Sequence, residues 1–321
     1  MGKKKMDRNK KKKIIIISAS SVSIISLILF LLAYRYLIER VEVPVVDNSK
    51  STITATSTAE SSDTETEDES AFISDDWNYS RNGLKISIKQ VEEGSGNNKI
   101  TYYVADVQMS SINSLQTAFA KNKFGRNITE DTSTIAEDND AIFAINGDYY
   151  GFRDDGVIIR NGTLYRDVAA RTAMGFTSDG YMKIFDENTI SSSELLSSGI
   201  IDTFSFGPAL VQEGVAVKDF EKVTVDTNIG NRTIDESNPR TGIGMIDKNH
   251  FVFVVVDGRS NGYSKGMTLT EFAKTFKNLG CTEAYNLDGG GSSTMYFMGR
   301  VVNNPQGKNK ERAVSDIIYL K

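Results

Sequence analysis

From residue 84 onward, apolar and polar residues alternate in short runs that are separated by turn residues. LKISIKQV (84–91) and KITYYVADVQM (99–109) alternate in this way on either side of a Gly/Asn-rich turn, so they predict a hairpin. The same pattern recurs around Asn161-Gly162, Asp179-Gly180, Glu213-Gly214 and Lys248-Asn249, four dipeptides that favour tight hairpin turns. Strands joined by short turns must be antiparallel, and this pattern therefore predicts antiparallel sheets.

Helical patterns are few. Residues 269–279 predict the clearest helix, because Thr268 and Glu271 form a capping box and Gly280 follows the last turn. LQTAFAKN (115–122) predicts a second, short helix, whereas AIFAI (141–145) predicts a short buried strand. No low-complexity break interrupts residues 76–321. The fold class predicted for them is α+β, a single sheet-dominated and mostly antiparallel domain with a few helices.

The N-terminal quarter has a different pattern. Residues 1–13 hold eight Lys or Arg and one Asp, a net charge of +7, and Ile14–Ala33 is a run of twenty uncharged residues. Such a run predicts a transmembrane helix over residues 14–38, and the basic residues before it predict a cytoplasmic N-terminus with the C-terminal domain outside a cell membrane crossed once. A cleaved signal peptide has the same order of charges and apolar residues. The length of the run and the absence of a small-x-small site after it favour a retained anchor.

Residues 39–75 read as a stalk between this anchor and the domain. From residue 41 the segment is rich in Ser and Thr and holds nine acids against one lysine, a net charge of −8. Its low apolar content predicts disorder. The formal charge of the whole chain is −5, and the N-terminal segments leave −5 for residues 76–321. Such a mildly acidic domain is not expected to bind nucleic acid.

Two scarce residue types exclude several chemistries. Cys281 is the only cysteine, so no intramolecular disulfide is possible, and its place after Gly280 at the start of a predicted strand favours a buried apolar role. His250 is the only histidine and is expected to lie exposed beside a hairpin turn. Ser-His-Asp and Cys-His catalysis and histidine-rich zinc sites are therefore excluded. The sequence requires no cofactor and no metal, although several aspartates could bind Ca²⁺ or Mg²⁺.

Three predicted strands end in turns that contain a carboxylate and glycine. These turns are Asn146-Gly147-Asp148, Asp257-Gly258-Arg259 and Asp288-Gly289-Gly290-Gly291. Asp-Gly is also a common turn dipeptide without any chemical role, and that alternative is open for each turn taken singly. Three consecutive glycines are harder to attribute to turn formation alone. Their N–H groups, with the hydroxyls of Ser292 and Ser293, could form a cradle for an anion.

Three arginines in turn contexts could bind such an anion. Arg171, Arg240 and Arg259 each stand beside glycine, proline or another turn signal, and arginine binds phosphate through two parallel hydrogen bonds. A solvated surface position is the alternative for each of them. With carboxylates and arginines as the remaining chemistry, a pair of aspartates acting as acid and as base or nucleophile would suit a glycosidic bond.

Several motifs resemble the phosphodiester glycosidase family. They are NPRTGIG, VVVDGR and GMTLTEFAKTFKNLGCTEAYNLDGGGSSTMYF, with AINGDYYG, NGTLYRD and FGPALVQEG upstream, and together they cover roughly residues 140–321. The resemblance implies hydrolysis of a sugar-1-phosphodiester with the C–O bond broken. It assigns catalysis to Asp148, Asp257 and Asp288, and substrate binding to Asn146, Arg171, Arg240, Arg259, Gly289, Gly290, Ser292 and Ser293.

Within this resemblance, Arg240 and Arg259 are expected to bind the phosphate, and Asp257 and Asp288 to divide the acid and base or nucleophile roles. The expected partner is a phosphate-linked carbohydrate, such as one that carries N-acetylglucosamine, on the cell-surface polysaccharide or teichoic acid of a Gram-positive bacterium. Two alternatives stay open. One is a phosphodiesterase that breaks the P–O bond, and the other is a non-catalytic, membrane-tethered protein that binds or assembles polysaccharide.

Overall fold

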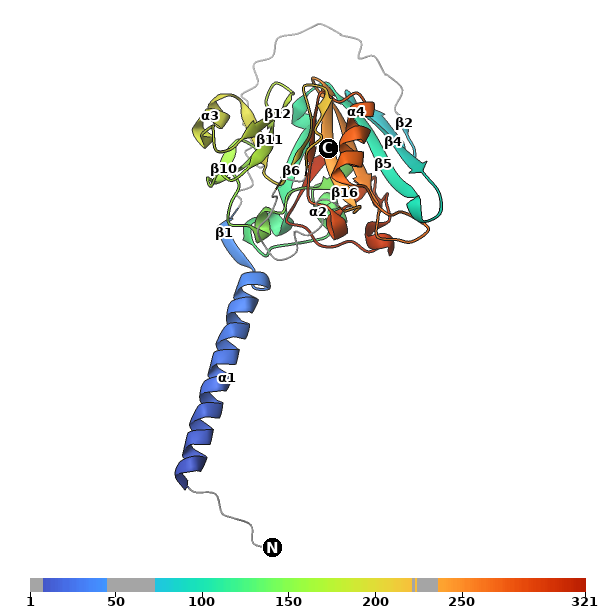
Figure 1. Cartoon of the computed structure of the whole chain (residues 1–321). Helices are drawn as coiled ribbons and strands as arrows, with labels where there is room; N and C mark the ends of the chain where they lie inside the picture. Colours follow the sequence, from blue (N-terminus) through green and yellow to red (C-terminus); the bar gives the residue numbers. More distant parts are fainter. Residues whose placement is uncertain (1–7, 45–72, 221–222, 224–235) are drawn as a thin grey trace.

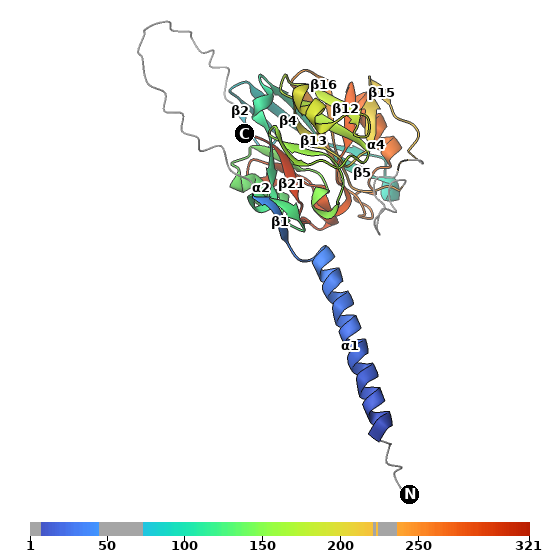
Figure 2. The same cartoon turned by 90° about the vertical axis from the view of Figure 1, so that its left-hand side faces the viewer.

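The computed structural model describes residues 8–44, 73–220, 223 and 236–321, with the side chains of residues 8–20, 43–44 and 73 left out (Figure 1). The first half of the predicted basic tail and most of the predicted stalk therefore lie outside the described residues. What is described after residue 72 forms one sheet-rich body, with the long helix α1 (Arg8–Tyr36) projecting from one end of it (Figures 1 and 2).

Two antiparallel sheets form the body. The larger has nine strands in the order β15 (Val215–Ala216), β14 (Ala209–Gln212), β18 (Glu283–Asn286), β16 (Arg240–Asp247), β17 (His250–Val256), β5 (Ile100–Met109), β4 (Leu84–Glu93), β3 (Asn78–Arg81) and β2 (Ile73–Ser74). The smaller has five, in the order β20 (Arg300–Val301), β19 (Met295–Phe297), β8 (Phe143–Asn146), β21 (Asp316–Leu320) and β6 (Leu115–Phe119). Every pairing between the described strands is antiparallel.

The main core lies between these two sheets. It joins Phe143 and Ile145 of β8 to Phe251 and Phe253 of β17, and the rings of Phe143 and Phe253 meet edge to face at 5.1 Å. A three-stranded sheet of β12 (Met182–Asp186), β11 (Thr172–Thr177) and β13 (Ile200–Phe204) extends the same core. Helix α4 (Leu269–Asn278) covers the other face of the nine-stranded sheet, and α2 (Thr132–Asp138) that of the five-stranded sheet (Figure 1). The described domain is thus a sheet-on-sheet sandwich with helices outside, as an α+β class predicts.

The predicted hairpins are confirmed. Asn161 and Gly162 both have positive φ and join β9 (Ile158–Arg160) to β10 (Thr163–Arg166), as the mirror-image turn requires. The turns at 94–98, 179–180, 213–214 and 248–249 join β4 to β5, β11 to β12, β14 to β15 and β16 to β17. The capping box of Thr268 and Glu271 is also present at α4. Cys281 is buried, and burial raises the pKa of its thiol to about 12.

The helix predicted over LQTAFAKN is wrong. Leu115–Phe119 is strand β6, followed by a single 3₁₀ turn at Ala120–Asn122. In this strand Leu115, Thr117 and Phe119 are buried and the residues between them are half-buried, which is the period of a strand. The partner is β21, about two hundred residues later in the chain. A pairing this distant leaves no local signal, and it outweighs the helix propensity of the segment.

The N-terminal region is described in part, as one helix and one strand. Searched over the described residues, the helices include none with the length and apolar character that a membrane span needs. Directly after α1, Arg40–Pro44 forms strand β1, which pairs with β7 (Lys123–Arg126) of the domain. A disordered stalk was expected to begin at residue 39. Residues 40–44 instead pair with the domain, and the chain then enters residues 45–72, which lie outside the described residues.

Candidate active site

The site lies where two strands of different sheets end. Asn146 ends β8 in the five-stranded sheet, and Asp288 follows β18 in the nine-stranded sheet. The Asn146 Nδ2 donates to the main-chain oxygen of Asp288 at 2.7 Å, and the Asp288 N–H donates to the Gly147 oxygen at 3.3 Å. The Asn146 Oδ1 in turn accepts from Thr241 Oγ1 at 2.8 Å. Asn146 is fully buried, so its amide acts as the clamp that holds two of the predicted turns together.

Asp148 is fixed by backbone donors. Its Oδ1 accepts the N–H of Tyr149 at 2.5 Å and its Oδ2 accepts the N–H of Ser205 at 2.7 Å. Its own N–H donates to Asp316 Oδ1 at 2.7 Å. A Cβ on the preceding Gly147 would lie 2.5 Å from the same Asp316 oxygen, which explains why glycine is needed at that position. The carboxylate of Asp148 therefore has one orientation, set from both sides.

A buried ion pair stands behind Asp148. Asp316 Oδ2 contacts Arg160 Nη2 at 2.6 Å, and both side chains are at most 2% exposed. Burial raises the pKa of Asp316 to about 6, although the charge of Arg160 lowers it in part. Burial by itself would lower the pKa of Arg160, but the carboxylate of Asp316 raises it overall. The pair thus holds the main chain of the Asp148 turn with a charged acceptor that solvent does not reach.

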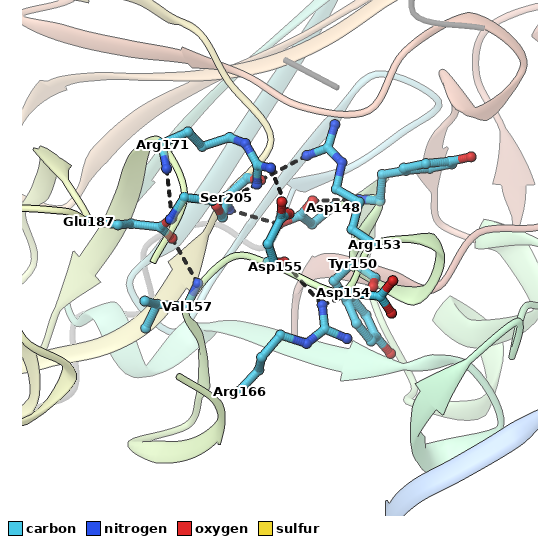
Figure 3. A network of polar contacts seen from close by, with 12 residues as sticks. Asp148, Tyr150, Arg153, Asp154, Asp155, Val157, Arg166, Arg171, Glu187 and Ser205 are labelled. Atoms are coloured by element: carbon cyan, nitrogen blue, oxygen red, sulfur yellow. Dashed lines mark hydrogen bonds and ion pairs between the residues drawn. The ribbon is translucent and has the colours of Figure 1, made fainter. Parts of the chain in front are cut away.

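Two arginines converge beside Asp148. Arg153 Nη1 and Arg171 Nη1 each donate to the main-chain oxygen of Ser205 at 2.9 Å, and Figure 3 shows the two guanidinium groups directed at that residue. Arg171 also pairs with Asp155 at 2.6 Å. The carboxylate of Glu187 accepts the N–H groups of Val157, Ala170 and Arg171 and fixes the backbone around them. Burial raises the pKa of Glu187, while these backbone donors lower it in part.

Asp288 faces an arginine that the motifs did not indicate. Its Oδ2 accepts from Ser292 Oγ at 2.5 Å and from Arg312 Nη2 at 3.1 Å. The Arg312 side chain is 47% exposed, whereas that of Asp288 is 13% exposed. Burial raises the pKa of Asp288; Arg312, Ser292 and Arg153 lower it in part, and the nearby Asp148 adds to the rise. This carboxyl group is therefore suited to keep a proton at higher pH than an ordinary aspartate.

The glycine turn lies between two arginines. A Cβ on Gly290 would lie 3.4 Å from Nη2 of Arg259, and a Cβ on Gly291 would lie 3.1 Å from Cδ of Arg312. Several N–H groups of the predicted anion cradle already have main-chain acceptors. The N–H groups of Gly290, Ser292 and Ser293 donate to the carbonyl oxygens of Pro239, Gly289 and Gly290, respectively. Because Gly290 and Gly291 have no side chains, the arginines on either side can approach the turn. Gly289 is needed for another reason, since a Cβ there would lie 2.8 Å from the Pro239 oxygen.

Asp257 is bound on both oxygens. Asn303 Nδ2 donates to its Oδ1 at 2.8 Å, Tyr263 Oη donates to its Oδ2 at 2.8 Å, and the Asn304 N–H reaches Oδ1 at 3.2 Å and Oδ2 at 3.0 Å. The residue is buried, and burial raises the pKa of its carboxyl group although these donors lower it in part. This geometry indicates that Asp257 ties the loop after β20 to the end of β17.

Arg240 has a similar structural setting. It is buried, and its Nε and Nη2 donate to the main-chain oxygens of Met267 and Glu236 at 3.0 and 2.9 Å. Arg259, by contrast, is exposed and holds Asn238 Oδ1 through Nε and Nη2 at 3.0 and 2.8 Å. In the bonds given above, Arg171, Arg240 and Arg259 have different partners. The guanidinium group of Arg259 lies beside Gly290, whereas Arg240 approaches Gly289 with its main chain.

Of the two predicted serines, Ser292 binds Asp288, and its Oγ accepts from Arg312 Nη2 at 2.6 Å. The buried Ser293 Oγ has no hydrogen-bond partner among the described residues. Sequence reasoning missed Arg153, Glu187, Asn303 and Arg312. Their contacts with the site cross 16 to 52 residues of chain in the bonds given above, and no local motif marks them. No group of three or more His, Cys, Asp or Glu in the described part of the chain is placed to hold a metal ion.

Residues 139–321 match the family model described as phosphodiester glycosidase. The chain is 31% identical over 206 residues to the SPbeta prophage-derived uncharacterized protein YomE of Bacillus subtilis (strain 168), which is 61% of this chain and 30% of that protein. It is also 31% identical over 110 residues to the N-acetylglucosamine-1-phosphodiester alpha-N-acetylglucosaminidase of Bos taurus, or 34% of this chain and 20% of that protein. The chain thus spans less than a third of the length of these curated relatives.

Solved structures share the fold. The zebrafish N-acetylglucosamine-1-phosphodiester alpha-N-acetylglucosaminidase catalytic domain, auto-inhibited by pro-peptide, superposes with a TM-score of 0.58 at 21% identity over 75% of this chain and 84% of that chain. A putative exported protein of Burkholderia pseudomallei K96243 gives a TM-score of 0.51 at 14% identity over 69% of this chain and 74% of that chain.

Proposed function

Because the chain belongs to the phosphodiester glycosidase family, we propose that it hydrolyses a sugar-1-phosphodiester between the anomeric carbon and the bridging oxygen. The products are a free sugar, such as N-acetylglucosamine, and a phosphomonoester. One observation carries the proposal: Asp148 and Asp288 come from the ends of strands in different sheets, and Asn146 holds their turns together. Two neighbouring carboxyl groups beside arginines are the machinery that breaks a bond to an anomeric carbon with an anionic leaving group.

The two carboxyl groups have different environments, which suggests different roles. Two backbone N–H groups orient the Asp148 carboxylate, so it is the group we propose to act on the anomeric carbon or to take a proton from the attacking water. Asp288, whose pKa is raised by burial, is proposed to carry a proton and give it to the leaving phosphate oxygen. In the balance of this step, water supplies hydroxyl to the sugar and its proton to Asp148, while the C–O bond electrons go to the phosphate.

The phosphate is proposed to bind at the glycine turn. Arg259 and Arg312 approach this turn from two sides, and both side chains are substantially exposed. Arginine suits this role because its planar fork of donors matches phosphate oxygens. Arg240, which was expected to share this role, has two of its donors bound to main-chain oxygens and is proposed to shape the turn instead.

A test with heavy-oxygen water separates this reaction from the P–O cleaving alternative. The full chain is incubated with a simple alkyl diester of N-acetylglucosamine 1-phosphate, and the phosphorus-containing product is weighed by mass spectrometry. An unlabelled alkyl phosphate together with free sugar supports C–O cleavage. Heavy oxygen in the phosphate would instead establish a phosphodiesterase.

Variants extend the same test to the non-catalytic alternative. Asp148→Asn is expected to lower kcat by at least about a hundredfold, because it removes an acid or base group at the reacting bond. The matched control Asp140→Asn alters an exposed carboxylate that pairs with Lys321 at 3.0 Å, and it should leave kcat unchanged. If the parent releases no sugar from any sugar-1-phosphodiester yet binds phosphate-linked polysaccharide, the protein is a binding or assembly protein.

The cell surface is proposed as the setting on sequence grounds. The support is the basic tail followed by twenty uncharged residues, which is typical of a single-pass anchor with its C-terminal domain outside. The proposed substrate is then a phosphate-linked sugar on a surface polysaccharide or teichoic acid. Fractionation of cells that express the full chain, with protease added from outside, tests both statements. Recovery in the soluble cytoplasmic fraction would reject the anchor.

A further inference from the structure

A segment far from the family motifs belongs to the folded domain. Strand β1 lies outside residues 139–321, which carry the family match, yet it pairs with β7 along four residues. Figures 1 and 2 show it between the end of α1 and the body. A Cβ on Gly125 of β7 would lie 2.0 Å from the main-chain oxygen of Arg40. The two backbones are therefore so close that only glycine fits at this position of β7.

The domain also binds the end of the helix before β1. The Nδ2 of Asn127 donates to the main-chain oxygens of Arg35 and Ile38 at 3.1 and 2.9 Å. These oxygens belong to the last turn of α1 and the residues after it, where a helix leaves carbonyl groups without intrahelical partners. An ion pair between Lys121 and Glu39 adds a second contact. The helix end is thus capped by a side chain of the domain, about ninety residues later in the chain.

The same elements hold the loop that carries the site. The N–H of Asn127 donates to the Gly151 oxygen at 3.0 Å, and Arg126 of β7 pairs with Asp154. Arg166 donates to the main-chain oxygens of Tyr150 and Asp155, both at 3.1 Å, as Figure 3 shows for Asp155. Its Nη2 also lies 4.0 Å from a carboxylate oxygen of Glu42 in β1. The loop of residues 148–155 supplies Asp148, Arg153 and Asp155 to the site.

We propose that residues 37–44 brace the catalytic loop, so that the N-terminal segment is a positioning element of the active site. The segment is fixed to the domain by β7 and Asn127. Because β7, Asn127 and Arg166 also contact residues 148–155, the segment limits the motion of that loop. Within the loop, Tyr150 packs in a buried aromatic cluster with Phe119 and Phe124. The order of the remaining loop residues depends on the hydrogen bonds and ion pairs given above. The consequence for turnover rests on the proposed function, while the consequence for loop motion does not.

Two variants of the full chain remove the brace without touching the site. Gly125→Ala places a methyl group where the Arg40 oxygen lies. Asn127→Gly keeps the positive φ of 56° at this position and removes only the capping amide. Each is expected to lower kcat by about five- to twentyfold with a much smaller change in KM, because misplacement of catalytic groups weakens the transition state most. Hydrogen exchange of residues 148–155 should become about tenfold faster, with the amides of α4 as the internal control.

Combination with Glu42→Pro, which removes an N–H that faces β7 and so disrupts the pairing of β1, gives a matched control. Once β1 is released, Gly125→Ala should cause no further loss in kcat or in exchange protection. Additive losses would mean that Gly125→Ala acts on β7 itself, and unchanged exchange in both single variants would also reject the brace. If no sugar-1-phosphodiester is cleaved by the parent but loop exchange responds as described, the proposed function fails and the brace stands.

Discussion

Asp257 and Asp288 follow neighbouring parts of the same sheet and are used differently. Asp257 follows β17 and Asp288 follows β18, the two strands that flank β16, and each aspartate precedes a glycine. Around Asp257, Asn303 donates to one carboxylate oxygen, Tyr263 to the other, and the Asn304 N–H to both. Around Asp288, the donors are Ser292 and the half-exposed Arg312. Of these two carboxylates, that of Asp288 is therefore the more open to a substrate, because one of its donors is a half-exposed side chain.

The pKa values of the two aspartates do not reveal this difference. Burial raises the pKa of both carboxyl groups, and in both cases hydrogen bonds lower it in part. What differs is the second partner of each donor. Asn303, for example, also holds the Ser293 oxygen at 2.9 Å and accepts the Met295 N–H at 2.8 Å through its Oδ1, so it cannot leave Asp257 without disturbing β19. Geometry thus separates a proposed catalytic group from a structural one where titration does not.

The sharpest way to break this comparison is to remove the charge of Asp288. Asp288→Asn is expected to lower kcat by about a hundredfold to a thousandfold, because the proposed proton donor is lost. Its unfolding free energy should change by less than about 1 kcal/mol, since the amide can still accept from Ser292. Steady-state kinetics and denaturant unfolding of the same preparation measure both. A loss of activity below about tenfold would remove Asp288 from the proposed mechanism.

The reverse pattern is expected for Asp257. Asp257→Ala leaves the donors of Tyr263, Asn303 and Asn304 buried without their acceptor, and it should lower the unfolding free energy by about 3 kcal/mol. The kcat of the folded fraction should fall by less than about tenfold. Urea unfolding gives the first quantity and active-site titration corrects the second. A stable variant with a loss like that of Asp288→Asn would return Asp257 to the catalytic pair.

The buried carboxyl of Asp316 gives a smaller effect that depends on pH. Its pKa is about 6 in the folded chain and near 3.8 in an unfolded one, so folding favours the protonated form. The resulting stability is complete below about pH 4 and is lost as the pH rises through about 6, a change of about 3 kcal/mol. The variant Asp316→Asn should lack this contribution. Its unpaired Arg160 lowers stability by a constant amount, since arginine does not titrate in this range.

The difference between the two unfolding curves, measured at several pH values, is the readout for Asp316. The parent should lose its advantage over Asp316→Asn as the pH rises from about 4 to about 6. A difference that stays constant over this range would show that Arg160 keeps Asp316 ionised throughout.

The parts of the fold that the sequence predicts are those decided within a few residues. Asn161-Gly162 gives a hairpin because both residues adopt positive φ, and Thr268 with Glu271 starts α4 by hydrogen bonds inside one turn. The segment at 115–122 was misassigned because its partner β21 is two hundred residues away. Strand β1 was not predicted for the same reason. The acidic composition around it predicts disorder, and its partner β7 lies about eighty residues later in the chain.

The site follows the same division. The turns of glycine and a carboxylate marked Asp148 and Asp288, and the structure brings these two turns together. The role of Asp257 depends on Asn303 and Asn304, which no motif indicates. The predicted arginines were the less successful part. Arg240 is buried on main-chain oxygens, while Arg153 and Arg312 occupy positions beside the aspartates through contacts that only folding creates.

The arginines show the same division between substrate-binding and structural side chains, with smaller expected effects on kinetics. Arg259→Ala and Arg312→Ala should each raise KM by about tenfold, or about 1.4 kcal/mol, because each removes one proposed phosphate contact. Arg240→Ala should leave the KM of the folded enzyme within about threefold and instead lower the unfolding free energy by about 2 kcal/mol, since the oxygens of Met267 and Glu236 lose a charged donor. Kinetics with the alkyl diester and urea unfolding measure both quantities. The assignment fails if Arg240→Ala raises KM more than the other two, because phosphate would then bind on the side of the turn that Arg240 occupies.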